Sequence, residues 1–198
     1  MNRPLLSASA GLALAISASP ASAAIFIVDA FTHSVNGGGG TPLSTGLTFS
    51  AGTTLTVSSS TNDLWSAGAL PRFSDANGLT GNRLATALDD SGQPVGTLIG
   101  INFGTPTFNG HTAAFGSLVG RINGVYQTLG ANFSGPAWAT GELQLFYWDS
   151  NQGDNSGQIA FNIAAVPEPA TWAMMIIGFG LIGGAMRARR QTVTFAKA

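Results

Sequence analysis

The fold is decided by the stretch Gln-Ile-Ala-Phe-Asn-Ile at residues 158–163, which alternates along its length. A period of two places Ile159, Phe161 and Ile163 on one face of an extended strand. The stretch Glu-Leu-Gln-Leu-Phe-Tyr at residues 142–147 alternates in the same way before it turns aromatic. Both stretches therefore predict half-buried β-strands.

Further strand patterns lie upstream at residues 53–58, 95–103 and 115–122, and helical periodicity is nearly absent between residues 24 and 166. Several short strands separated by glycine-rich turns are typical of an all-β sandwich or barrel. We expect the β-sandwich domain at residues 47–165. Residues 24–46 are predicted to add an N-terminal strand and a flexible hinge at the four consecutive glycines.

The composition excludes several classes of protein. Of 198 residues only 9% are charged, the net charge is -1 and there is no cysteine. An ordinary soluble domain has about 25% charged residues. Near-neutrality argues against a nucleic-acid partner, and the lack of cysteine excludes disulfide scaffolds, thiolate zinc sites and cysteine nucleophiles. Residues 24–166 hold three basic and eight acidic side chains, so the central part is acidic.

The N-terminus has the pattern of a secretory signal peptide at residues 1–23. Arg3 is followed by an apolar stretch at residues 5–16 and then by small residues. Ala21 and Ala23 fit the A-x-A cleavage rule, which makes Ala24 the first mature residue. The sequence thus predicts export through the Sec machinery and cleavage by signal peptidase.

The C-terminus predicts a transmembrane helix at residues 170–186, because these seventeen residues contain no charge. A helix of this length spans about 25 Å, slightly less than a bilayer core. Trp172 is placed as an interfacial aromatic anchor, and the basic residues that follow are predicted to stay cytoplasmic. Residues 191–198 would then be a cytoplasmic tail.

The same segment resembles the PEP-CTERM sorting signal of the PEPxxWA subtype over residues 166–190. The residues that match are Pro167, Glu168, Pro169, Trp172, Arg187, Arg189 and Arg190. In that family an exosortase recognises the signal and removes it near the PEP motif. The resemblance implies a transient inner-membrane anchor, followed by release to the cell surface or extracellular matrix.

A polar loop, Asp-Ser-Asn-Gln-Gly-Asp-Asn-Ser-Gly at residues 149–157, lies between two predicted strands. Calcium prefers six to eight oxygen ligands at about 2.4 Å. Asp149, Asp154 and Asn155, together with one or two backbone carbonyls, could supply part of such a set. Because Asp, Asn and Gly are also ordinary turn formers, a plain turn remains the alternative.

Four short motifs occur in one order, at residues 65–68, 115–122, 141–149 and 153–157. This order resembles the bacterial galactophilic lectin family over roughly residues 47–163. The resemblance implies a galactose-binding-like β-sandwich of the jelly-roll type, in which one calcium ion bridges protein and sugar hydroxyls.

Carried over to this sequence, the resemblance implies side-chain calcium ligands at Asp149, Asp154 and Asn155. It implies backbone ligands near Ala67 and within Asn151 and Gln152. The sequence also departs from the lectins, because residues 71–94 contain no histidine for a sugar contact. Galactose specificity is therefore not implied.

Three aromatic residues near the loop, Trp138, Tyr147 and Trp148, could stack on sugar rings. For Tyr147 and Trp148 we expect one buried side chain and one exposed side chain. No nucleophile elbow is present, and no motif singles out a pair of acids.

The favoured hypothesis is a non-enzymatic surface or matrix protein that binds calcium and a carbohydrate of the extracellular polymer. The alternatives are a structural or adhesive module without a ligand and, less favoured, a glycan-processing enzyme with two placed acids.

Overall fold

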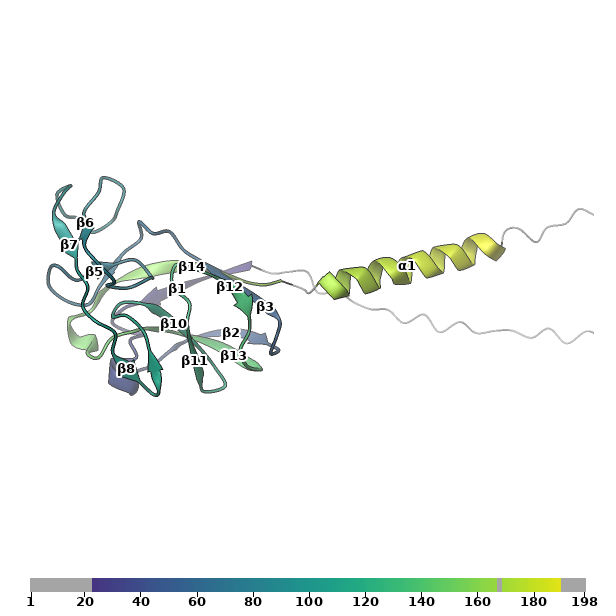
Figure 1. Ribbon diagram of the computed structural model, residues 1–198, viewed down its shortest axis with the longest axis horizontal. Coiled ribbons are helices and arrows are strands. Elements are labelled where there is room, and N and C mark those ends of the chain that lie inside the picture. The colour runs from purple at the N-terminus through teal and green to yellow at the C-terminus, as the bar shows by residue number, and fades with distance from the viewer. Residues whose placement is uncertain (1–22, 167–168, 190–198) are drawn as a thin grey trace, which may run out of the picture. The chain divides into compact units, whose positions relative to one another are not determined.

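The computed structural model describes residues 23–166 and 169–189 (Figure 1). The chain divides into two compact units, one formed by the strands and one that contains the C-terminal helix. Each is described by itself. All buried residues of the hydrophobic core belong to the strand unit, which therefore has a core of its own.

The larger sheet contains six strands that pair only antiparallel. Its order is β12-β3-β14-β4-β5, and β1 pairs with β14 as well. The eleven-residue β14 is thus the central strand. The bounds are β1 Ala23–Asp29, β3 Thr54–Ser58, β4 Trp65–Ser66, β5 Phe73–Ser74, β12 Asn132–Pro136 and β14 Ser156–Val166.

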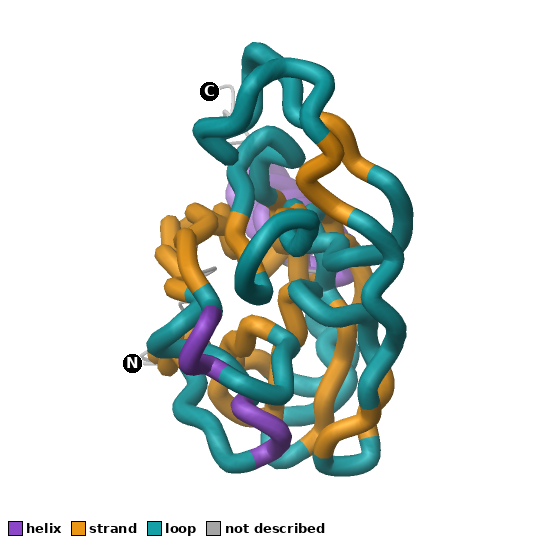
Figure 2. Tube along the Cα trace, turned by 90° about the vertical axis from the view of Figure 1, so that its left-hand side faces the viewer, coloured by secondary structure: helices purple, strands orange, loops and turns teal. Residues whose placement is uncertain are grey.

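The second sheet has four antiparallel strands in the order β11-β10-β13-β2. Two short hairpins, β6 with β7 and β8 with β9, extend from the connections, and loops make up much of the trace (Figure 2). The bounds are β2 Leu43–Phe49, β10 Leu118–Ile122, β11 Val125–Thr128, β13 Gly141–Tyr147, β6 Arg83–Leu84, β7 Leu98–Gly100, β8 Thr107–Phe108 and β9 His111–Thr112.

The two sheets pack on one hydrophobic core. Ile159, Phe161 and Ile163 of β14 are fully buried in the same cluster as Leu143 and Leu145 of β13. The alternation at residues 158–163 therefore faces the core as predicted. The all-β prediction is confirmed, and two sheets on one core form a sandwich. The jelly-roll assignment stays a prediction.

The N-terminal segment belongs to the sandwich. The strand expected near residue 25 is β1, which pairs along its whole length with β14. The glycine run forms a hydrogen-bonded turn and not a hinge, since the Gly38 and Gly40 N–H groups both donate to the Val35 carbonyl at 2.8 Å. A Cβ at position 40 would lie 1.8 Å from the Ser34 carbonyl oxygen, so this turn requires glycine there.

The C-terminal unit contains one described helix, α1, from Pro169 to Arg189. Proline suits the first turn of a helix, where its missing N–H costs no hydrogen bond. Within residues 23–166 and 169–189, no helix is long and apolar enough to cross a membrane. The span expected at residues 170–186 stays a prediction, as does the signal peptide, which lies almost entirely outside the described residues.

Candidate functional site

The polar loop connects β13 to β14 and contains a short 3-10 turn at Gln152–Asp154. The Asn151 side chain caps this turn by accepting the Gly153 N–H at 3.1 Å. The loop is also tied to the N-terminal segment, because the Gly37 N–H donates to the Asp149 carbonyl at 3.1 Å. These bonds hold the loop in one conformation at the end of the sandwich.

Asp149 is a buried carboxylate with a residue exposure of 5%. Its Oδ1 accepts the backbone N–H groups of Ser150 at 2.6 Å and of Asn151 at 3.5 Å. Burial raises the pKa of Asp149 above its usual range, and the nearby Asp154 carboxylate raises it further, although the backbone bonds offset part of this. The site therefore holds negative charge at an energetic cost.

Two buried oxygens beside this carboxylate lack partners. Among the residues that the structure describes, neither Oδ1 of Asn155 nor the hydroxyl of Tyr147 has a hydrogen-bond partner. The Asn155 amide group faces the Ala30 carbonyl at 3.2 Å, which fixes the orientation of the side chain. Burial raises the pKa of Tyr147 well above its usual value, and both aspartates contribute to the rise. Several buried oxygen atoms thus lie close to the Asp149 carboxylate, and two of them have no hydrogen-bond donor among the described residues.

Asp154 is shared between two neighbours. Its Oδ1 accepts the Asn151 side-chain amide at 3.0 Å, and its Oδ2 lies 3.5 Å from the Arg72 guanidinium. Arg72 also donates to the Ala67 carbonyl at 3.3 Å and lies over the Phe103 ring at 4.3 Å. A cationic side chain therefore already contacts two of the oxygens assigned to calcium.

The backbone at Gly68 approaches Asp154 closely. A Cβ at this position would lie 2.6 Å from Asp154 Oδ2, and the φ of Gly68 is +120°. Gln152, expected as a backbone ligand, accepts the Asn155 N–H through its carbonyl at 3.2 Å.

The structure thus brings the three side chains predicted as ligands to one end of the sandwich. Within the described part of the chain, no cluster holds three or more His, Cys, Asp or Glu residues. A cation here would therefore depend on amide and backbone oxygens as well as on carboxylates.

Sequence reasoning missed Arg72 and the hydroxyl of Tyr147. No spacing marks Arg72, and the only available signal was that it is one of three basic residues among eight acids in the central part. Tyr147 was considered only as a stacking surface.

The expectation that one of Tyr147 and Trp148 is exposed is wrong, because both have 0% exposure. They face opposite sides of their sheet, as alternation requires. Tyr147 joins the core between the sheets, whereas Trp148 joins a second cluster with Val119 and Phe146. Its indole lies 5.2 Å from Phe108 of the β8–β9 hairpin, which covers the outer face. Trp138 is half-buried at the rim of the core.

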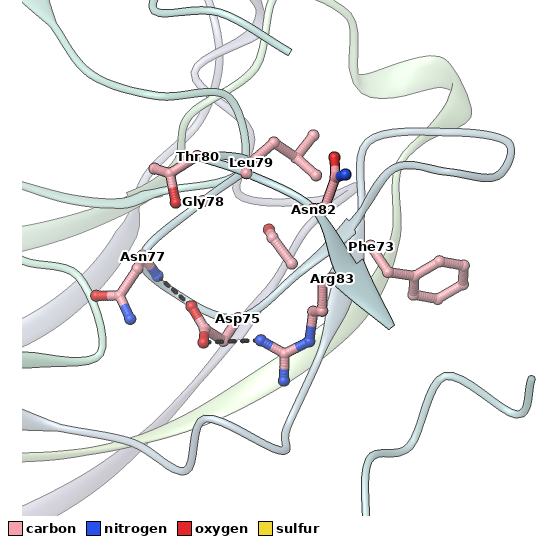
Figure 3. A pocket seen from close by; sticks show the side chains of 10 residues that line it. Phe73, Asp75, Asn77, Gly78, Leu79, Thr80, Asn82 and Arg83 are labelled. Atoms are coloured by element: carbon pink, nitrogen blue, oxygen red, sulfur yellow. Dashed lines mark hydrogen bonds and ion pairs between the residues drawn. The ribbon is translucent and has the colours of Figure 1, made fainter. Parts of the chain in front are cut away.

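A separate polar pocket of about 230 Å³ lies at residues 73–83 (Figure 3). Its wall contains an ion pair between Asp75 and Arg83 at 3.0 Å. None of the side chains or backbone positions predicted to bind calcium lines it.

The predicted sorting and cleavage residues lie at the ends of the described chain. Ala23 and Ala24 begin β1, whereas Pro169, Trp172, Arg187 and Arg189 belong to α1. Ala21, Pro167, Glu168 and Arg190 lie outside the described residues.

The C-terminal segment matches a known family. Residues 165–190 match the family described as the PEP-CTERM protein-sorting motif. The chain carries a PEP-CTERM sorting motif. The motif implies processing by an exosortase, export and sorting to the cell surface.

Among solved structures, the chain is similar to the EclA N-terminal domain, a PllA-like lectin, with 20% identity and a TM-score of 0.46. The similarity covers 72% of this chain and 95% of that domain. The search of curated proteins found no match. The resemblance to the sorting signal noted in the sequence thus has a counterpart among known families.

Proposed function

We propose that this PEP-CTERM protein is a non-catalytic surface or matrix protein whose sandwich binds calcium and, through calcium, a carbohydrate. The observation that carries the calcium proposal is the buried, unpartnered Oδ1 of Asn155 beside the buried carboxylate of Asp149. The carbohydrate part rests on the order of the sequence motifs.

The donor chemistry suits a hard cation. Leaving a buried acceptor without a donor costs about 1–3 kcal/mol, and a cation would relieve this cost. Asp149, Asp154 and Asn155 offer carboxylate and amide oxygens, which are the ligands that calcium prefers. The carbonyls of Ala67 and of residues 151–152 would add backbone oxygens, and sugar hydroxyls would fill remaining positions.

The test is thermal unfolding of the full chain with calcium and with chelator. With two carboxylates we expect a Kd of about 10⁻⁴ to 10⁻³ M, as in other extracellular sites. At 100 times its Kd, calcium adds about 2.7 kcal/mol of stability. This raises the midpoint by roughly 5–10 °C for a chain of this size. Equal midpoints with calcium and with chelator would contradict the proposal.

One observation favours the alternative of a structural module without a ligand. The Arg72 guanidinium already neutralises Asp154 and caps the Ala67 carbonyl. Calcium must displace this partly exposed ion pair, and such pairs contribute about 0.2–1 kcal/mol.

The substitution Arg72→Gln distinguishes a calcium-binding domain from a structural module without a ligand. If calcium is the ligand, we expect the substitution to tighten calcium binding about twofold to fivefold, because the competing ion pair is gone. Arg121→Gln, which removes a cation paired with Gln144 and Tyr126 on the other sheet, is the matched control and should leave the Kd unchanged. If neither the wild type nor Arg72→Gln binds calcium, the structural module is the better description.

For the sorting motif, we propose that Pro167, Glu168 and Pro169 are the exosortase recognition residues. Glu168→Ala should leave the full-length chain uncleaved in the cell fraction, whereas the wild type loses its tail and reaches the surface fraction. Immunoblots of both fractions measure this. Glu142→Ala, a change within the sandwich, is the control, and normal processing of Glu168→Ala would exclude the assignment.

A further inference from the structure

The pocket at residues 73–83 is built around a polar wall. Asp75 has a side-chain exposure of 11%, and its Oδ2 accepts the Arg83 guanidinium at 3.0 Å. Its Oδ1 accepts the Asn77 backbone N–H at 2.8 Å, so the carboxylate is held between two donors (Figure 3). Asp75, the residue after β5, and Arg83, the first residue of β6, thus meet at this ion pair.

Arg83 retains donor capacity. One terminal nitrogen bonds Asp75 and the other donates to the Thr61 carbonyl. Its buried Nε has no hydrogen-bond partner within the described residues. Nε is too deeply buried to reach a ligand, but each terminal nitrogen of a guanidinium carries a second N–H. The spare donor capacity of Arg83 therefore lies at its terminal nitrogens.

The rim of the pocket is polar as well. Thr80, Gly81 and Asn82 line it and are exposed. The ring of Phe73 extends away from Asp75 (Figure 3) and packs against the small cluster of Leu64, Ala85 and Ile99. Recognition in this pocket would therefore use polar groups and not ring stacking.

Charge and size indicate the class of ligand. The opposite charges of Asp75 and Arg83 cancel, so the wall has no net attraction for an ion. A hydroxyl group can donate to the carboxylate and accept from the guanidinium at once. The volume of about 230 Å³ is below the roughly 300–1,000 Å³ of pockets for drug-sized ligands, which suits a single sugar ring.

We propose that this pocket is a calcium-independent subsite for one neutral sugar unit. The subsite lies outside the calcium loop, since Asp149, Asp154 and Asn155 do not line it. A chain with both sites would contact a polysaccharide at two separate places on the same domain.

Gly81→Phe is the variant that tests the subsite. Asp75→Asn is the obvious choice, but it breaks a buried ion pair and could unfold the protein. Position 81 lines the pocket, a Cβ there meets no atom within 4 Å and its φ is not left-handed. A phenylalanine there can fill the pocket without backbone strain. Gly39→Phe is the matched control, because position 39 is equally open but lies outside the pocket.

The experiment is saturation-transfer NMR on the full chain in chelator, in a zwitterionic detergent without a sugar headgroup. The probes are glucose, galactose, mannose and N-acetylglucosamine, with galacturonate and glucosamine as charged comparisons. We expect at least one neutral sugar to bind with a Kd on the order of millimolar. Gly81→Phe should weaken this binding at least about tenfold, whereas Gly39→Phe should leave it unchanged.

Several outcomes would overturn the subsite. These are no signal from any neutral sugar in chelator, equal signals in wild type and Gly81→Phe, or preferential binding of a charged sugar. A signal that requires calcium and survives Gly81→Phe would overturn the subsite while supporting the proposed function. A calcium-independent signal lost in Gly81→Phe supports the subsite even if calcium does not bind anywhere.

Discussion

Replacing Trp65 by alanine is expected to destabilise the protein by about 3–5 kcal/mol, as for other fully buried aromatic residues. Trp65 has 0% exposure and lies edge-on to Tyr147, with ring centroids 4.7 Å apart. Its indole N–H also donates to the Gly116 carbonyl at 2.8 Å. The substitution thus leaves a cavity and removes the nearer of two side-chain donors to the buried Gly116 carbonyl. Since whole domains are stable by only about 5–15 kcal/mol, the loss is a large fraction of the total.

Denaturant unfolding of the full chain measures this loss, and Trp138→Ala is the control. Trp138 is half-buried at the rim, where its indole N–H donates to the Val125 carbonyl. We expect Trp138→Ala to cost less than half as much as Trp65→Ala. Equal losses would mean that the core is not centred on Trp65. Because Trp65 supports Tyr147, the Trp65 variant should also bind calcium more weakly.

Asp149→Asn is expected to change the stability in opposite directions with and without calcium. Burial and Asp154 raise the folded-state pKa of Asp149. A raised carboxyl pKa means that stability is greatest below the unfolded-state value and falls as the pH rises through the folded-state value. Asparagine keeps the shape and the Oδ1 acceptor but carries no charge. In chelator at neutral pH, the variant should therefore unfold at a higher temperature than the wild type.

In saturating calcium the order reverses. The variant loses the carboxylate ligand and with it the stabilisation of about 2.7 kcal/mol that calcium gives at 100 times its Kd. Melting curves between pH 4 and pH 8, in chelator and in calcium, measure both effects. The advantage of the variant in chelator should grow as the pH rises from about 4, near the unfolded-state pKa of an aspartate.

Asp89→Asn is the matched control, because the pKa of this aspartate is shifted the other way. Burial is the largest single influence and acts to raise this pKa, but the hydrogen bonds from Ser91 and Thr86 together outweigh it and lower the pKa of Asp89 to about 2. Its charged form therefore stabilises the fold at neutral pH, and the amide should lower the melting temperature with or without calcium. If Asp149→Asn also lowers the melting temperature in chelator, the charge of Asp149 does not destabilise the calcium-free fold.

Strand content was predictable because it depends on a local pattern. The alternation at residues 158–163 placed Ile159, Phe161 and Ile163 on one face, and all three are fully buried. The strands that pair with β14 could not be predicted. Pairing of β14 with β1 on one side and with β3 and β4 on the other joins residues that are 90 or more positions apart in the sequence.

The candidate site was predictable only as far as it is local. Asp149, Asp154 and Asn155 lie within seven residues, so their proximity follows from one loop. Arg72, the residue before β5, reaches the same place from 82 positions away from Asp154. No pattern in one sequence reports such a contact, which forms only when β4 and β5 pair beside β14.

Local order in the chain was enough to establish the strands, the polar loop and the sorting motif, because each is a pattern over a few consecutive residues. The folded arrangement was needed to place Trp148 under the β8–β9 hairpin, to turn the glycine run into a tight bend, and to join Asp75 to Arg83 in one pocket. These features depend on which surfaces cover one another. Burial and pairing between distant segments are properties of the whole fold, and side-chain charge and accessibility at the site follow from them.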